Sequence, residues 1–139
     1  MKRCSPVLVL PGVLCLAAAG ALAGAQATEK AMQAVQSWLQ LVDAGRYRRS
    51  YKDAANYFQS RIAESKWIAR VKPIRQPLGA VISRRLQTAQ YTTSLPGAPD
   101  GQYVVMAFDT SFQNKKSAVE TVTAMLDRGR WRVCGYFIR

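Results

Sequence analysis

The chain has 139 residues and a formal charge of +12, from 20 Lys and Arg against 8 Asp and Glu. This length allows one domain, and with 49% hydrophobic residues the chain has enough apolar material for a core. It contains no His and only three Cys, which excludes His-dependent nucleophilic catalysis and the common zinc sites.

The first 25 residues have the order of a secretory signal. Lys2 and Arg3 precede an apolar run from about Val7 to Leu22, and small-residue frames of the Ala-x-Ala type follow. A membrane anchor is the alternative, but prolines and glycines interrupt the run, which is also short for a membrane span. We therefore expect a signal peptide at 1–25 and a single domain over 26–139. After cleavage the protein would be exported, as a periplasmic or secreted protein.

Removal of this segment would leave Cys134 as the single Cys, because Cys4 and Cys15 lie within it. The formal charge would fall from +12 to +10 with the loss of Lys2 and Arg3. A lone Cys in an apolar strand is typical of a small buried side chain, and no His exists to activate it. We therefore predict neither a disulfide within the mature domain nor a catalytic thiol.

Three helices are predicted before residue 80. The first begins with Thr28 as its N-cap and ends near Gly45. Its apolar residues recur at helical spacing: Ala31, Val35, Trp38, Leu39 and Val42. A second helix follows over about 47–62. A third, over 64–71, ends before Pro73, because the residue that precedes a proline disfavours helical geometry.

After Gly79 the pattern changes to strands separated by polar or turn-rich segments. Four strands are predicted: Val81–Thr93, Tyr103–Phe112, Ala118–Leu126 and Trp131–Ile138. Helices that cover one face of an antiparallel sheet make an α+β domain. The predicted fold class is therefore α+β, with N-terminal helices packed on a curved antiparallel sheet of about four strands.

The last hairpin allows a prediction of register. If Arg128 and Gly129 form a two-residue turn, Leu126 faces Trp131, and counting back places Glu120 opposite Phe137. The helix-covered face would then hold Phe137. The open face would carry four residues that we expect to serve a homodimer or another partner: Thr121, Thr123, Arg132 and Tyr136.

Short motifs in a fixed order extend over nearly all of the expected mature domain. They are Trp38-Leu39, Asp43-x-Gly45-x-Tyr47, Trp67, Arg75-x-Pro77-Leu78-Gly79, Leu95-Pro96-Gly97-x-Pro99-Asp100-Gly101-x-Tyr103-Val104-Val105, Ser111-Phe112, Glu120-Thr121-Val122-Thr123 and Trp131-Arg132-Val133-x-Gly135-Tyr136-Phe137-Ile138. In these motifs the chain resembles the bacterial family DUF4019, a domain of unknown function. The resemblance implies an exported protein with a cystatin-like, or nuclear-transport-factor-2-like, α+β cone. It implies no activity and no catalytic residues.

Asp109 and Glu120 are the candidate catalytic residues. A four-residue loop at Gln113–Lys116 would place the two carboxylates opposite each other on the helix-covered face. Two close carboxylates raise the pKa of one of them, which makes an acid/base pair for an isomerase or a lyase. Two alternatives stay open: a salt bridge from one carboxylate to a base such as Arg139, or opposite faces if the loop differs by one residue.

Eleven basic residues lie between Arg46 and Arg85, opposed only by Asp53 and Glu64. Seven of them are candidates for binding a ligand or an anion: Arg46, Arg48, Arg49, Lys52, Arg75, Arg84 and Arg85. Such a field attracts anionic envelope components, namely lipid headgroups or acidic polysaccharide, whereas a merely solvated charged surface is the alternative. Interleaved tyrosines could stack on bases, but the expected export argues against a nucleic-acid partner.

Metal binding is not expected, because His is absent and no acidic cluster has the spacing of a calcium loop. No cofactor is indicated either. We therefore predict an exported binding or interaction module rather than an enzyme. An enzyme built on the acidic pair and a basic adaptor for anionic envelope components are the two alternatives.

Overall fold

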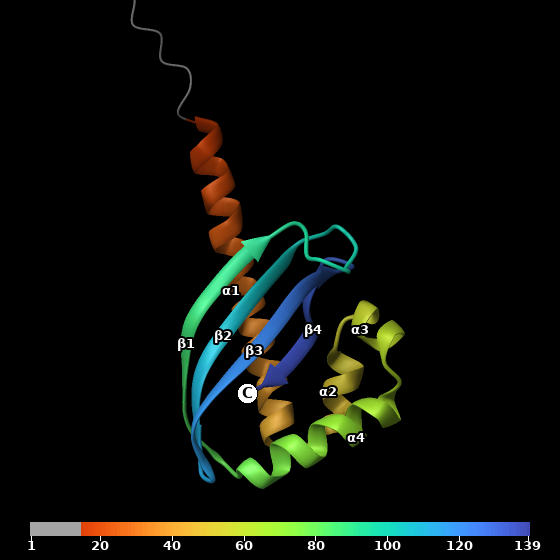
Figure 1. The fold of residues 1–139 in the computed structure, drawn as a ribbon. Coiled ribbons are helices and arrows are strands. Elements are labelled where there is room, and N and C mark those ends of the chain that lie inside the picture. Colours follow the sequence, from red (N-terminus) through yellow and green to blue (C-terminus); the bar gives the residue numbers. More distant parts are fainter. Residues whose placement is uncertain (1–14) are drawn as a thin grey trace, which may run out of the picture.

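The computed structural model describes residues 15–139. Within them, four helices come first: α1 (Cys15–Asp43), α2 (Tyr47–Asp53), α3 (Asn56–Arg61) and α4 (Glu64–Arg75). A short 3-10 helix, η1 (Gln76–Leu78), leads into four strands: β1 (Val81–Thr92), β2 (Tyr103–Phe112), β3 (Lys115–Asp127) and β4 (Arg130–Ile138). The strands form one antiparallel sheet in the order β1-β2-β3-β4, so each pairs with its neighbour in the sequence (Figure 1).

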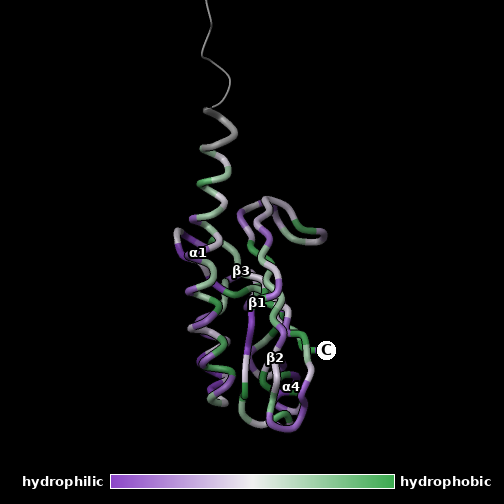
Figure 2. The backbone as a smooth tube through the Cα atoms, turned by 90° about the vertical axis from the view of Figure 1, so that its left-hand side faces the viewer, coloured by the Kyte–Doolittle hydropathy of each residue, from purple (hydrophilic) through white to green (hydrophobic). Residues whose placement is uncertain are grey.

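This arrangement confirms the predicted α+β fold class. The long helix α1 runs along one face of the curved sheet, α2 and α3 lie beyond the β4 edge, and α4 runs from there below the strands toward the start of β1 (Figure 1). Seen from the side, α1 and the sheet form two layers (Figure 2). The predicted apolar stripe of α1, from Ala31 to Val42, is buried against strand residues such as Val104, Met106 and Val122. Burial of this apolar surface is the main force that holds the two layers together.

Helix α1 begins earlier than predicted. Thr28 is not an N-cap: its hydroxyl donates a 2.8 Å hydrogen bond to the carbonyl oxygen of Gly24, one turn back in the same helix. Alanines before Thr28 favour helical geometry, which explains the extension. Ala27 is the first buried residue, and residues 19–26 are largely exposed. Among residues 15–139, no helix combines the length and apolarity needed to cross a bilayer. Residues 1–14 of the predicted signal lie outside the described part.

The two following helices also differ from the prediction. The segment predicted as one helix over 47–62 is interrupted at Ala54 and Ala55, which are extended and buried. The amide of Ala55 donates a 2.8 Å hydrogen bond to the carbonyl oxygen of Val133 in β4, so a tertiary contact replaces a helical one. Helix α4 continues through Pro73, against the predicted end, and carries the buried Arg75 in its last turn.

Four register shifts interrupt the described sheet, two of them between β1 and β2, and the other two change the predicted pairing of β2, β3 and β4. The β2–β3 turn contains two residues, Gln113 and Asn114, instead of the predicted four, and a register shift follows between Thr110 and Phe112. The β3–β4 turn is at Arg128 and Gly129 as predicted, both with positive φ.

Beyond that turn, a second register shift between Thr123 and Ala124 leaves Cys134 without an opposite residue and pairs Val122 with Tyr136. Placing Tyr136 on the open face and Phe137 on the covered face was therefore wrong. Tyr136 contacts the core and Phe137 is 54% exposed. The physical reason is the period of two in a strand, because one extra residue exchanges the faces of everything beyond it.

Candidate functional site: a buried charge cluster and a basic pocket

Arg84 of β1 is the centre of a buried charge cluster between α1 and the sheet. Its guanidinium donates two hydrogen bonds to Glu120 of β3, from Nε to Oε1 at 2.8 Å and from Nη2 to Oε2 at 3.2 Å. It donates two more to Asp43, from Nη1 to Oδ2 at 2.8 Å and from Nη2 to Oδ1 at 3.0 Å. Arg84 therefore joins the last residue of α1 to the third strand through two bidentate contacts.

The Glu120 side chain is completely buried and takes hydrogen bonds from three side chains. Besides Arg84, the Thr110 hydroxyl donates to Oε1 at 2.6 Å and the Tyr136 hydroxyl donates to Oε2 at 2.5 Å. Burial lowers the pKa of Arg84, but the hydrogen bonds and charges of Asp43 and Glu120 outweigh it and raise that pKa above its usual value. Burial, together with the Glu120 charge, raises the pKa of Tyr136. The cluster thus favours the charged form of Arg84 and the neutral form of Tyr136.

Arg75 of α4 completes the cluster. Its Nη2 donates to Asp43 Oδ1 at 3.2 Å and its Nη1 donates to the carbonyl oxygen of Gly79 at 2.6 Å. Its guanidinium also lies over the Phe112 ring, 4.6 Å from the centroid. Two arginines therefore neutralise two carboxylates, which is the arrangement that buried charges require. This cluster ties α1, α4 and all four strands together.

The structure does not bring the predicted catalytic carboxylates together. Asp109 pairs in register with Val119, whereas Glu120 pairs with Phe108, so the two acids lie on opposite faces of the sheet. The predicted register was wrong because the turn is two residues shorter and a bulge follows it. On the open face, Asp109 Oδ2 lies 3.7 Å from Nη2 of Arg85, and both side chains are exposed.

The seven predicted anion-binding residues do not form one surface either. Arg75 and Arg84 point into the buried cluster and are bound to carboxylates there. Arg48 is paired with Glu64 at 2.9 Å, and Arg85 lies beside Asp109 on the open face of the sheet. The remaining three lie on or beside α2: Arg46, Arg49 and Lys52. Of the seven, only Arg49 lines the basic pocket described next.

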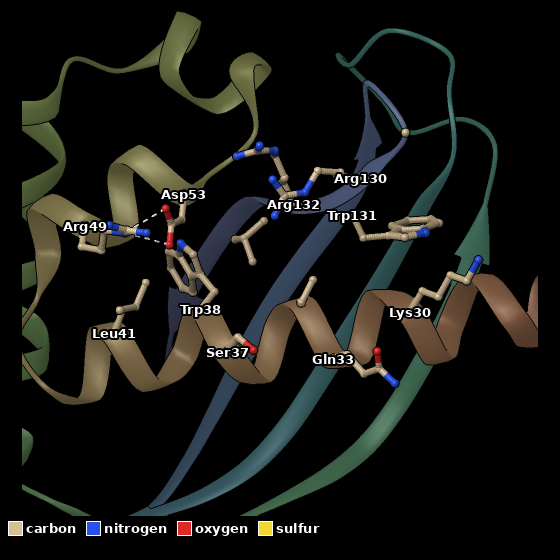
Figure 3. A pocket seen from close by; sticks show the side chains of 13 residues that line it. Lys30, Gln33, Ser37, Trp38, Leu41, Arg49, Asp53, Arg130, Trp131 and Arg132 are labelled. Atoms are coloured by element: carbon tan, nitrogen blue, oxygen red, sulfur yellow. Dashed lines mark hydrogen bonds and ion pairs between the residues drawn. The ribbon is translucent and has the colours of Figure 1, made fainter.

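A basic pocket of about 720 Å³ lies where α1 and α2 meet the hairpin end of β4. Its basic side chains come from three elements: Lys30 from α1, Arg49 from α2, and Arg130 and Arg132 from β4. Arg49 and Asp53 lie at one end of the pocket, joined by a 3.0 Å ion pair, and Trp131 and Lys30 lie at the other end (Figure 3). Arg130 and Arg132 lie between these ends (Figure 3).

The pocket joins strong positive charge to aromatic walls. Asp53 is its only acidic lining residue, and it is already paired with Arg49. Within residues 15–139, the other three basic side chains take part in no ion pair. Trp131 is half-buried, whereas Trp38 is buried and donates its indole N–H to the carbonyl oxygen of Ser50 at 2.8 Å. This arrangement can hold a ligand that carries several negative charges.

Sequence reasoning missed three of the four basic pocket residues. Lys30 and Arg130 are about one hundred residues apart in the chain, and only the contact of α1 with β4 brings them together. The one available signal was the run from Arg128 to Arg132, which contains three arginines at the tip of a predicted hairpin. Charge at a hairpin tip is also typical of a solvated turn, so this signal alone does not indicate a pocket.

The described helices and four-stranded sheet define the class of this protein: a small α+β protein with one helix-covered sheet face. The chain belongs to the family described as "Protein of unknown function (DUF4019)", whose model matches residues 34–136. That match confirms the family resemblance seen in the sequence motifs, and it covers the domain from the core-facing part of α1 to Tyr136. No curated protein matches the chain.

Proposed function

We propose that this protein is an exported, non-enzymatic binding module that holds a polyanionic ligand in the basic pocket. One observation carries the proposal: Lys30, Arg49, Arg130 and Arg132 converge from three elements on one concavity. Basic residues scattered over a surface serve solubility, whereas four around a single cavity raise the local concentration of anions.

The chemistry of the pocket favours phosphate or carboxylate groups. The arginine guanidinium presents a planar set of donors that matches these anions in a bidentate way, and Lys30 adds a flexible point charge. Trp131 offers an aromatic wall for an apolar or cyclic part of the ligand. In a bacterial envelope, lipid headgroups and acidic polysaccharides carry these groups.

Export is proposed on two supports. The residues at 1–25 have the composition and order of a secretory signal. The packed part of the domain also begins at Ala27, close to the predicted boundary, because the preceding turns of α1 are largely exposed. Loss of the segment would therefore leave the core and the basic pocket in place.

Isothermal titration with tripolyphosphate tests the anion pocket. We expect binding that weakens as salt rises, because screening reduces attraction between partly exposed charges. The Arg130→Gln/Arg132→Gln variant should bind roughly tenfold more weakly or worse. The Lys115→Gln/Lys116→Gln variant loses the same charge at the opposite end of β3 and should bind like the parent. Phosphatidylglycerol vesicles and a sulfated polysaccharide, tested on the same variants, would distinguish lipid from polysaccharide ligands.

Two results would contradict the proposal of an anion-binding pocket. If both double variants lose the same affinity, the ligand responds to the overall charge of the protein and the pocket is not a site. If tripolyphosphate, vesicles and polysaccharide all fail to bind the parent, the anion proposal is wrong.

A further inference from the structure

A second concavity, of about 260 Å³, lies between α4 and the last residues of β4. We refer to it as the edge groove. Its lining is mostly apolar and includes Trp67, Val71 and Ile74 from the helix and Phe137 and Ile138 from the strand. Ile74 and Phe137 are 56% and 54% exposed, so two large apolar side chains face solvent at the rim of the edge groove. The basic pocket shares no lining residue with it.

Within residues 15–139, the outer edge of the β4 backbone has no hydrogen-bond partner along this groove. Val119 and Arg139 exchange both of their backbone hydrogen bonds, at 2.9 and 3.1 Å. Antiparallel pairs alternate, so Phe137 also points its N–H and C=O toward β3, whereas Tyr136 and Ile138 point theirs outward. The sheet order makes β4 an edge strand. Among residues 15–139, no hydrogen bond is found for these outward groups.

The same edge is covered further back along the strand. The carbonyl oxygen of Val133 accepts a 2.8 Å hydrogen bond from Ala55, in the link between α2 and α3. The chain itself therefore closes the first half of the β4 edge and leaves the second half, beside the edge groove, without a backbone partner. An open edge with an apolar groove alongside is the geometry used to bind an extended peptide.

The arginines at the rim of the edge groove indicate the charge that a partner should carry. Arg70 is exposed, lines the edge groove and takes part in no ion pair within the described residues. Arg139 follows directly after Ile138 and is exposed as well. The other arginine of the lining, Arg75, is held by Asp43 and Gly79. A partner that carries one carboxylate beside its apolar residues would therefore find an unpaired guanidinium at the rim.

We propose that the edge groove binds an extended peptide segment of a partner protein, which adds a fifth strand to β4. Its backbone pairs with Tyr136 and Ile138, its alternate apolar side chains enter the groove against Val71 and Ile74, and an acidic residue meets Arg70. A fatty acid would match the apolar lining and the arginine, but an alkyl chain supplies no groups for the outward N–H and C=O. The backbone edge therefore favours a peptide over a small apolar acid.

The test uses a displayed library of random peptides selected on the purified protein. Ile74→Glu changes an exposed wall of the edge groove. Ile82→Glu makes the same change at an exposed position of β1, and is the matched control. We expect selected peptides to have alternating apolar residues and an acidic residue, and to bind the parent and the Ile82→Glu variant equally. Ile74→Glu should weaken binding by roughly tenfold or more.

Hydrogen exchange of individual amides gives the readout specific to strand addition. A bound peptide should slow exchange at Tyr136 and Ile138, whose amides point outward, and N-methylation of alternate peptide amides should abolish binding. Selection of no peptide, equal binding to Ile74→Glu, or binding without slower exchange would each overturn the proposal. Displacement of a peptide by laurate, with no amide protection by any peptide, would assign the groove to small apolar acids instead.

Discussion

Tyr136 of β4 and Glu120 of β3 are diagonal neighbours on the helix-covered face of the sheet, joined by a 2.5 Å hydrogen bond from phenol to carboxylate. The bulge at Cys134 makes this contact, because without it Tyr136 would point to the other face. Tyr136 also contacts Trp38 edge-on, with ring centroids 5.2 Å apart. The residue therefore links the buried charge cluster to the aromatic part of the core.

Glu120→Gln should destabilise the protein strongly. The amide keeps the size of the side chain but leaves Arg84 with only Asp43 as a charged partner in a buried place. Breaking a buried ion pair from one side costs about 3 kcal/mol or more. Asp109→Asn makes the same change on the open face, where the pair with Arg85 is exposed, and should stay within about 0.5 kcal/mol. Urea unfolding compares the two; equal losses would show that the cluster does not stabilise the fold.

Tyr136→Phe should lower the free energy of unfolding at neutral pH and make it depend less on pH in the alkaline range. Burial and the Glu120 charge raise the pKa of Tyr136 above its unfolded value. The fold therefore favours the neutral phenol. Its contribution to the free energy of unfolding is complete below the unfolded pKa of about 10, and it is lost as pH rises above that value. The variant loses a hydrogen bond to a charged group, about 1.5–3 kcal/mol, at neutral pH. Between about pH 10 and 12 its free energy of unfolding should fall less than that of the parent. If the free energy of unfolding falls equally with pH in the parent and the variant, Tyr136 does not have this role.

Cys134 should be unreactive in the folded protein. Burial raises the pKa of its thiol to about 12, so little thiolate exists near neutral pH. In a variant with Cys4 and Cys15 replaced by Ser, a thiol-specific reagent at about pH 8 should react roughly a hundredfold more slowly than with the unfolded chain. Equal rates before and after unfolding in urea would show that the thiol is accessible.

Gly79→Ala should destabilise the protein more than Gly97→Ala. Both glycines have positive φ, 75° and 76°, which strains an alanine, and Gly79, with ψ of −158°, lies in a part of this region that is nearly restricted to glycine. A Cβ at Gly79 would also lie 2.9 Å from Oε1 and 3.0 Å from Cβ of Gln113, whereas nothing lies within 4 Å at Gly97. The difference between the two variants in thermal unfolding measures this contact. Equal losses would mean that Gln113 moves away freely.

The sequence was sufficient for features that depend on local periodicity. Apolar residues from Ala31 to Val42 recur every three or four positions, and one helical face must bury them. The turn at Arg128 and Gly129 was also predictable, because two residues with positive φ suit a tight hairpin and glycine adopts that geometry readily.

Bulges were not predictable in the same way. Tyr136 and Phe137 are adjacent aromatic residues. Whichever alternate set of β4 residues faces the helices, an aromatic side chain therefore enters the core. The pattern therefore gave no sign that Cys134 shifts the register, and the contact of Tyr136 with Glu120 was missed. The same ambiguity placed Asp109 with Glu120. A turn shortened by two residues leaves both acids on one face, so the unpredicted one-residue bulge between Thr110 and Phe112 is what separates them.

The candidate site was hidden for a different reason. Lys30 and Arg130 meet only because α1 packs beside β4, and no local pattern encodes that long-range contact. The high density of basic residues between Arg46 and Arg85 was evident from the sequence. Which of them are buried against carboxylates and which lie at the surface was not. Arg84 and Arg75 have carboxylate partners inside the fold, whereas Arg49 lies at the surface.

The order of the sheet has a consequence for folding kinetics. Every strand pairs with its neighbour in the sequence, so the three hairpins can form by closing short loops. Arg84 instead reaches Asp43 across 41 residues and Glu120 across 36. We expect the hairpins to form early and the docking of α1 onto the sheet to come after the transition state. Interactions formed that late slow unfolding more than they speed folding. The buried charges would then govern how long the native state lasts, rather than how quickly it forms.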